Sequence, residues 1–339
     1  MTAVQKRRLG IQLVAFLGGL GLLGVLVRNV GVAEVAGHLR QFGWLAPLLP
    51  LPYIAVLVCD TKGWACAIPP TAQAHAVPFW YLSLARLAGE AINDLTPTAS
   101  IGGEPVKVYL LRARGLTTDA GLASVVVAKT TLTISQIVFI LLGLSFLLSR
   151  LGWARQGWWV LGPLLVLAAG FVILLIRWQR RKPTGMAVRA LGHLLPRWSG
   201  LEGWAARAQL IDAHLLGFYD GNYRRFIAST IYHFLGWLLG AAEVFFFCRL
   251  MGVSATPVDA LIIEAMVQPV TAAALIIPGA LGVREAGGVF LCRLVGLDDG
   301  VGLTLMALKR ARETAYNLIG LAVLARLGGA PLPRKVHSL

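Results

Sequence analysis

The chain has 339 residues, of which 57% are hydrophobic and only 14% are charged, and its mean hydropathy is +0.71. Soluble domains contain about 25% charged residues, so this composition excludes an ordinary soluble enzyme and favours several apolar segments of about 20 residues. The net charge of +15 does not indicate nucleic-acid binding, because the 31 Lys and Arg residues punctuate apolar stretches and form no single basic face. We predict a helical membrane protein, since a helix satisfies its own backbone N–H and C=O groups within the bilayer.

The N-terminus has three basic residues followed by an apolar run, 9–27. This run is too long for the hydrophobic region of a typical signal peptide, and Arg28 follows it without a small-residue cleavage site. We therefore predict a retained first helix. The short amphipathic segment 31–43 is expected to lie along the outer membrane interface.

Six segments have the length and hydropathy of a membrane-spanning helix. They are 9–27, 44–66, 119–149, 157–176, 225–250 and 300–325. With the N-terminus inside, most Lys and Arg residues outside these segments fall on the cytoplasmic side, and the dense cluster 177–189 follows a helix directly. This distribution obeys the positive-inside rule, so we predict an inner-membrane-type protein with both termini cytoplasmic.

Two further stretches, 78–112 and 257–294, are apolar but are broken near their centres by Pro and Gly. They also carry charged residues that a lipid-facing helix would not tolerate. We interpret both as re-entrant helical hairpins that enter the membrane and return on the same side. Non-helical backbone is compatible with that depth only where protein or a wet cavity covers it.

The two hairpins align without a gap at one fixed sequence offset, as internal duplications do. The matched pairs include Pro97 with Pro278, Glu104 with Glu285, Arg112 with Arg293, and Lys129 with Arg310. Each half is predicted to run helix, hairpin, helix, and the single helix 157–176 separates the halves. The second half must then enter from the opposite side, which predicts an inverted repeat of the kind found in transporters.

The predicted fold is all-α: a polytopic membrane protein with about six spanning helices and two re-entrant helical hairpins in an inverted repeat. We expect one membrane domain, 1–339. Its parts are 1–43 (first helix and outer interfacial helix), 44–149 (repeat half one), 150–224 (connecting helix and basic cytoplasmic loop), 225–326 (repeat half two) and 327–339 (cytoplasmic tail).

Two bases are expected near the middle of the membrane. Lys129 and Arg310 lie about ten residues into their helices, hence about 15 Å deep in a hydrocarbon core of about 30 Å. Charges at that depth are costly unless they are paired or face a cavity. One interpretation is that they bind an anionic lipid head group, such as a phosphate. The alternative is internal ion pairing, with Glu104 for Lys129 or with Glu313 for Arg310.

The hairpin centres supply further candidates, because a half-helix that starts at depth can bind an anion through its N–H groups and its dipole. The head-group candidates are Asn93, Gly102 and Gly103 in the first hairpin and Gly282 and Arg284 in the second. Glu104 and Glu285 sit beside the predicted helix starts. An acid in this position either caps the helix or serves in gating or coupling of transport.

Catalytic motifs are lacking from the sequence, which has no nucleophile elbow, zinc-protease motif or phosphate-binding loop in context. The four cysteines lie in or beside apolar segments without a CxxC pattern, so we interpret them as buried thiols. We expect no catalytic residue, no metal ligand and no cofactor, and hence a protein that is not an enzyme.

The hairpin motifs resemble the lysylphosphatidylglycerol synthase transmembrane-region family, which includes flippase-like and hopanoid-biosynthesis-associated membrane proteins. They read Asn-Asp-Leu-Thr-Pro and Gly-Gly-Glu-Pro-Val-Lys-Val-Tyr-Leu-Leu in the first hairpin and Ile-Pro-Gly-Ala-Leu-Gly-Val-Arg-Glu-Ala-Gly in the second. The resemblance covers nearly the whole chain and implies lipid handling in a bacterial inner membrane. In bifunctional members this module is associated with flipping an aminoacylated lipid made by a separate soluble synthase domain. The chain ends at Leu339 without such a domain, so we expect no lysyl transfer.

The resulting hypothesis is a flippase-like lipid transporter that moves an anionic or isoprenoid-type head group past Lys129 and Arg310. The alternatives are a membrane-embedded transferase acting on lipid head groups, an accessory subunit of one, and a structural partner of a lipid-synthesis complex. The expected partners are membrane lipid and enzymes of lipid synthesis, and nucleic acid is not expected.

Overall fold

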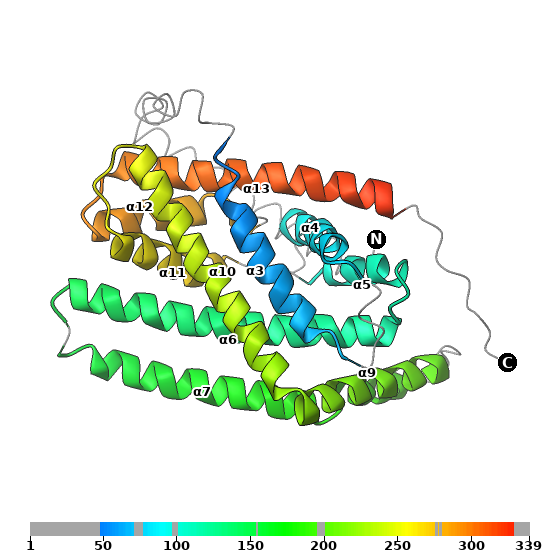
Figure 1. Cartoon of the computed structure of the whole chain (residues 1–339). Coiled ribbons are helices and arrows are strands. Elements are labelled where there is room, and N and C mark those ends of the chain that lie inside the picture. Colours follow the sequence, from blue (N-terminus) through cyan, green and yellow to red (C-terminus); the bar gives the residue numbers. More distant parts are fainter. Residues whose placement is uncertain are drawn as a thin grey trace.

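The computed structural model describes residues 48–70, 77–96, 101–153, 155–194, 201–274, 277 and 280–328, and the regular elements in these ranges are all helices. In chain order they are α3 (Pro52–Ala67), α4 (Phe79–Leu95), α5 (Glu104–Arg112), α6 (Thr118–Arg150), α7 (Trp158–Arg180), α8 (Pro183–Leu194), α9 (Leu201–Gly221), α10 (Tyr223–Leu250), α11 (Pro257–Ala273), α12 (Val283–Leu294) and α13 (Asp299–Leu327) (Figure 1). The predicted all-α class is confirmed. The helices expected within 1–43, and most of the tail, lie outside the described residues.

Among the described helices, three are long and apolar enough to cross a membrane: α6, α7 and α10. They coincide with three predicted spans, 119–149, 157–176 and 225–250. Two other predicted spans correspond to α3, which has 16 residues, and α13, which has 29 residues but contains the charged run Lys309–Glu313. Helix α13 has the length of a span without the composition of a lipid-facing one, because its charges need polar partners.

Each predicted hairpin, 78–112 and 257–294, forms two helices separated by a break: α4 and α5 in the first, α11 and α12 in the second. The first hairpin depends on a close approach, since a Cβ on Gly103 would lie 1.8 Å from the carbonyl oxygen of Gly89. In the second hairpin Gly282 has a φ of 78°, in the left-handed region that favours glycine. Both breaks therefore require glycine.

The helices follow the same order in the two halves, α3 to α6 and α10 to α13. The turn after α5 contains Gly115 at φ 87°, and the turn after α12 contains Gly296 at φ 85°. The last two helices of each half also make equivalent contacts. These are Gly121 on Val108 and Gly302 on Val289. Residues matched by the sequence offset therefore occupy matching turns and matching helix contacts in the two halves.

Two apolar clusters hold the bundle together. One joins α6 to α10, α11 and α13 through buried residues that include Phe139, Phe247, Ile262 and Leu305. The other joins α3, α4, α5, α6 and α9 through Trp64, Tyr81, Leu110 and Leu215, among others. Helix α7 belongs to neither cluster: Gln179 is its one buried residue, and Trp159 is 85% exposed. Because α7 is apolar on its exposed surface, that surface suits contact with lipid.

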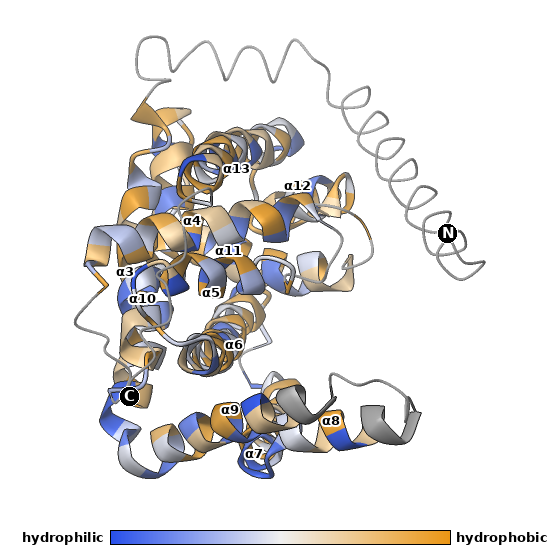
Figure 2. Ribbon diagram, turned by 90° about the vertical axis from the view of Figure 1, so that its right-hand side faces the viewer, coloured by the Kyte–Doolittle hydropathy of each residue, from blue (hydrophilic) through white to orange (hydrophobic). Residues whose placement is uncertain are grey.

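The predicted basic loop within 150–224 contains two helices, α8 and α9, which lie with α7 in a layer beside the main bundle (Figure 2). Asp212 of α9 accepts hydrogen bonds from the backbone N–H groups of Thr184 (3.2 Å) and Gly185 (2.9 Å). A carboxylate at a helix start satisfies N–H groups that lack partners within the helix. This side chain therefore fastens the start of α8 to α9.

Three glycine-to-alanine variants should destabilise the protein in the order Gly302→Ala, Gly121→Ala, Gly162→Ala, with the last neutral or stabilising. The new Cβ would lie 2.7 Å from the backbone Cα of Val289 at Gly302, 3.0 Å from the Cγ1 of Val108 at Gly121, and more than 4 Å from any neighbour at Gly162. Overpacking costs about 1–3 kcal/mol, whereas alanine is better than glycine inside a helix by about 0.5–1 kcal/mol. Free energies of unfolding in detergent micelles test the order, and equal effects at Gly302 and Gly162 would contradict it.

Candidate functional site

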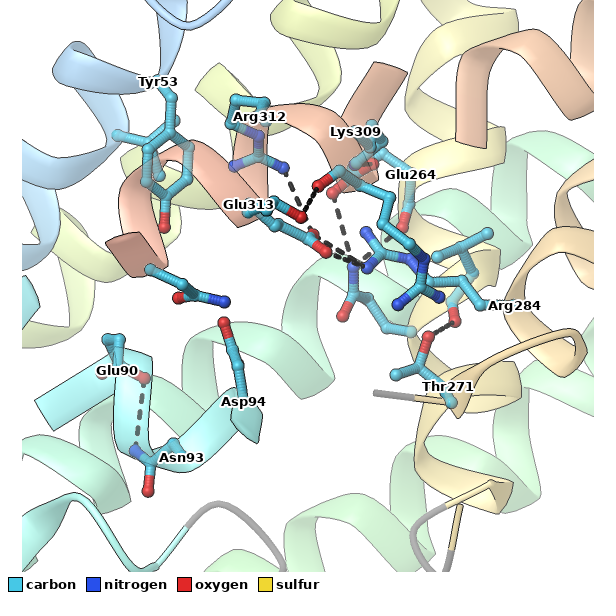
Figure 3. A pocket seen from close by; sticks show the side chains of 18 of the residues that line it. Tyr53, Glu90, Asn93, Asp94, Glu264, Thr271, Arg284, Lys309, Arg312 and Glu313 are labelled. Carbon is cyan, nitrogen blue, oxygen red and sulfur yellow. Dashed lines mark hydrogen bonds and ion pairs between the residues drawn. The ribbon is translucent and has the colours of Figure 1, made fainter. Parts of the chain in front are cut away.

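A cavity of about 490 Å³ lies between the two halves. Its walls come from α3, α4 and α6 of the first half and from α10 to α13 of the second. The volume is within the range of about 300–1,000 Å³ that is typical of ligand sites. The charged residues that line the cavity are Asp60, Arg86, Glu90, Asp94, Glu243, Glu264, Arg284, Lys309, Arg310, Arg312 and Glu313. Figure 3 shows α4, with Glu90 and Asp94, across the cavity from Arg284 and Glu313.

Buried charges in the second half are compensated by ion pairs. Lys309 of α13, whose side chain is only 2% exposed, contacts the carboxylate of Glu264 on α11. Arg284 of α12 donates from Nη1 to both carboxylate oxygens of Glu313, at 2.8 Å each. Removing one partner of such a pair strands the other charge in the interior, at a cost of about 3–5 kcal/mol. These pairs therefore fix how α11, α12 and α13 meet.

Arg312 connects the second half to the first. Its guanidinium lies 3.4 Å from the carboxylate of Glu243 on α10 and 3.4 Å from that of Glu313. It also lies over the ring of Tyr53 on α3, 4.1 Å from the ring centroid. A cation over an aromatic face is attracted by the ring electrons, and the attraction is stronger where water is excluded. The cavity is therefore bridged by side chains from both halves.

Charged side chains of the first half form one continuous series, which we call the first-half charge chain. In spatial order its members are Asp60, Arg86, Glu90, Lys107, Glu104 and Lys129, with N–O distances of 2.8–3.7 Å between neighbours. All of its members except Asp60 line a second, much smaller pocket, which shares Arg86 and Glu90 with the main cavity. Four helices, α3 to α6, thus contribute to one electrostatic unit.

The two bases predicted from the sequence make equivalent ion pairs. Lys129 Nζ lies 3.2 Å from Oε1 of Glu104. Arg310 donates to Oε1 of Glu285 from Nε (2.7 Å) and Nη2 (2.6 Å). The internal pairing considered for Lys129 is therefore present. The carboxylate that pairs with Arg310 is Glu285, whereas the sequence suggested Glu313, which instead binds Arg284.

The two hairpin breaks are closed by side chains. The N–H of Gly103 donates to Oδ1 of Asn93 (2.7 Å), and the N–H of Gly282 donates to Oε2 of Glu285 (2.6 Å). Glu285 therefore caps the start of α12, which is one of the two roles considered for it, and it also pairs with Arg310. An anion would have to displace a side chain to reach either N–H group.

The sequence model of the lysylphosphatidylglycerol synthase transmembrane region matches residues 11–320. The chain belongs to this family. The match includes both hairpins, both equivalent ion pairs and every residue that lines the cavity. No curated protein and no solved structure matches the chain significantly. Family membership and the apolar helices identify a membrane protein with a lipid-related role.

In this family member, the residues predicted to bind a head group gather around two pockets. Asn93, Arg284 and Arg310 line the main cavity. Lys129 lines the smaller pocket, together with Glu104, which was predicted as a gating or coupling residue. The other candidates lie at the hairpin breaks: Gly102 and Gly103 precede α5, and Gly282 precedes α12. Binding of a head group by these residues stays a prediction.

Several charged residues of the site were not among the candidates from the sequence, and Arg86, Glu90 and Glu264 are examples. Each lies in a helix of a predicted hairpin and is at most partly exposed. The available signal was the presence of charge within an apolar segment, which marks a functional candidate by default. For Arg86 and Glu90 the spacing of four residues adds a second signal, because it places both on one helix face.

The buried pair Glu264–Lys309 should show strong coupling in a double-mutant cycle. Glu264→Gln and Lys309→Met should each lower the free energy of unfolding by about 3–5 kcal/mol, because each strands the partner charge. The double variant should lose clearly less than the sum of the two. Unfolding of the purified protein in mixed micelles measures the cycle, and additive losses would show that the two charges do not depend on each other.

Proposed function

We propose that this membrane protein is a flippase-like lipid transporter whose cavity carries a polar head group across the hydrocarbon core. The supporting observation is a charge-lined cavity between two halves of an apolar helical bundle. A charged head group is very costly in hydrocarbon, and paired side chains of both signs offer it a polar path. The acyl or isoprenoid tails remain in lipid outside the bundle.

The proposed topology has six spans, cytoplasmic termini and an inverted repeat, with hairpin α4–α5 entering from one face and hairpin α11–α12 from the other. It is supported by the equivalent ion pairs Glu104–Lys129 and Glu285–Arg310. In an inverted repeat, equivalent contacts fall on opposite sides of the midplane. Each pair then serves as the closing contact of one side, which assigns a gating role to Glu104 and Glu285.

The proposed substrate is an anionic or isoprenoid-type lipid whose head group carries a phosphate. Lys129 and Arg310 have side chains that are 35% and 29% exposed, whereas Lys107, Lys309 and Arg312 are at most 6% exposed. The two exposed bases are thus best placed to exchange a carboxylate for a lipid phosphate. Ammonium and guanidinium groups both form charge-assisted hydrogen bonds to phosphate oxygens.

The topology predicts opposite accessibility of the two hairpin breaks. Ile101→Cys and Leu281→Cys are each made in a background without the four native cysteines. A membrane-impermeant maleimide should label one of them only in inside-out vesicles and the other only in right-side-out vesicles. The reason is that the two breaks belong to oppositely oriented halves. Labelling of both positions from the cytoplasmic face alone would exclude the inverted arrangement.

Neutralising either exposed base should slow head-group movement. Lys129→Met and Arg310→Met should each reduce the rate by about tenfold or more, because a hydrogen bond to a charged group contributes about 1.5–3 kcal/mol. The measurement uses proteoliposomes containing a fluorescent anionic phospholipid, with the outer leaflet quenched by dithionite. Arg189→Met, at an exposed position of α8, is the matched control and should move lipid at the wild-type rate.

The same experiment separates transport from the alternative functions. A transferase, or a subunit of one, would change the amount of a modified lipid without moving the probe between leaflets. A structural partner would tolerate both substitutions. Wild-type protein that moves no probe, or variants that move it at full rate while remaining monodisperse, would rule out the proposed transport site.

A further inference from the structure

In the first-half charge chain every carboxylate lies between two bases. Asp60 lies between His233 of α10 and Arg86, Glu90 between Arg86 and Lys107, and Glu104 between Lys107 and Lys129. With His233 added, the series begins at a buried imidazole and ends at Lys129, the most exposed base of the first-half charge chain. In the second half Lys309 contacts Glu264 and Arg310 contacts Glu285, and a shorter series of contacts joins Arg284, Glu313, Arg312 and Glu243.

Two pairing patterns are present at once in this series. In the first, each carboxylate takes the base on the Lys129 side: Asp60–Arg86 at 2.9 Å, Glu90–Lys107 at 2.8 Å and Glu104–Lys129 at 3.2 Å. In the second, each takes the base on the His233 side: Asp60–His233 at 3.1 Å, Glu90–Arg86 at 3.7 Å and Glu104–Lys107 at 3.1 Å. A change from one pattern to the other therefore needs only small side-chain movements.

His233 lines the smaller pocket and has a ring nitrogen that can bind a proton. Its side chain is 1% exposed, and its Nδ1 lies 3.1 Å from Oδ1 of Asp60. Its Nε2 is buried and has no hydrogen-bond partner among the described residues, although the ring lines the smaller pocket. Imidazole is the side chain whose ordinary pKa, about 6.5, lies nearest to neutral pH.

Charged groups face His233 from several helices. Asp60 of α3, Arg86 of α4, Lys107 of α5 and Lys129 of α6 belong to the charge chain, which lines the same pocket or contacts the ring. Further titratable side chains, from other helices, lie beside residues of α10 elsewhere along its length. These are Lys62 of α3 over the ring of Tyr232, Tyr219 of α9 against Phe226, Glu264 of α11 beside Gly240, and Arg312 of α13 beside Glu243.

The charge balance of the chain connects His233 to Lys129. With a neutral imidazole, the carboxylates of Asp60, Glu90 and Glu104 match the bases Arg86, Lys107 and Lys129 in number. A proton on His233 adds a positive charge that no carboxylate of the chain is left to match. An uncompensated charge in the interior is costly, and an anion beside the exposed end of the chain removes the excess.

We propose that His233 is a proton-binding site that couples the uptake of one proton to the binding of an anionic lipid head group at Lys129. The proton comes from water and binds Nε2, after which the imidazolium forms an ion pair with the carboxylate of Asp60. The pairing then shifts by one place along the chain, and Lys129 exchanges Glu104 for the head-group phosphate. This inference rests on the proposed function, because it takes the lipid head group as the anion.

The coupling is reciprocal, since the free energy by which a proton favours the anion equals that by which the anion favours the proton. One proton bound per anion makes the affinity rise by up to about tenfold for each unit by which pH falls, within the range where His233 titrates. Movement of an anionic lipid through this site would then carry a proton with it.

The test measures proton uptake during binding to the purified full-length protein. Dihexanoylphosphatidylglycerol serves as the anionic probe, because its phosphodiester keeps one charge at neutral pH. Calorimetric titration at about pH 7, in two buffers of different ionisation enthalpy, should give about one proton taken up per probe bound. Dihexanoylphosphatidylcholine, which has the same phosphodiester but no net charge, should cause no uptake.

A matched pair of histidine variants locates the proton. His233→Gln should bind the anionic probe without taking up a proton, since glutamine retains a hydrogen bond to Asp60 but does not titrate. His214→Gln is the control, because His214 forms a comparable pair with Asp119, 2.8 Å apart, outside the charge chain. It should take up the proton as the wild type does.

Each outcome decides one question. Probe binding without proton uptake by the wild type would overturn the coupling while leaving the proposed transport site intact. Equal uptake by the wild type and His233→Gln would also overturn it, because the proton would then bind elsewhere. Absence of probe binding at every pH would overturn both the head-group site and the coupling built on it.

Discussion

Charge inside an apolar helical bundle must be compensated by charge of the opposite sign, and this requirement organises the described structure. Lys309 and Glu264 are almost completely buried, and neither would be stable there alone. Their pairing joins α13 to α11, and the contacts of Arg312 with Glu243 and Tyr53 join α13 to α10 and α3. The first part of α13, up to Arg312, must therefore face the interior of the bundle, although the length of the helix alone would suit a lipid-facing span.

The same requirement divides the helices by role. Helices α3, α4, α6 and α10 to α13 surround the charged cavity, whereas α7 stands apart and exposes apolar side chains such as Trp159 and Val166. A charged cavity inside a bundle with apolar outer surfaces suits a molecule whose outer solvent is lipid. The charged cavity between the halves follows from the helices that must face one another.

The two halves share a scaffold but differ in their electrostatics. The pair of a glutamate at the start of a half-helix with a base on the next helix occurs in both, as Glu104–Lys129 and Glu285–Arg310. Other charged positions are not shared: the position equivalent to Arg86 is Val267, and the position equivalent to Glu264 is Ser83. Equivalent ion pairs thus coexist with charge contacts that differ between the two halves.

Much of this protein was determined by local features of its sequence. Hydropathy identified α6, α7 and α10 as candidate spans, and glycine and proline located both hairpin breaks. A fixed offset matched Glu104 with Glu285 and Lys129 with Arg310. Such features are local because helix length, breaks and repeats depend on residues close together in the chain. The role of those four residues in transport was a prediction from the sequence and remains one.

The tertiary structure decided which carboxylate meets which base. On a single helix, Glu313 is the natural partner of Arg310, since residues three apart share a face. The packing of α12 on α13 instead gives Glu285 to Arg310 and Glu313 to Arg284. Arg86 and Glu90 joined the site only because α4 lies between α3 and α5. Ion pairs act over a few ångströms in space, so the order of residues along the chain could not fix these partners.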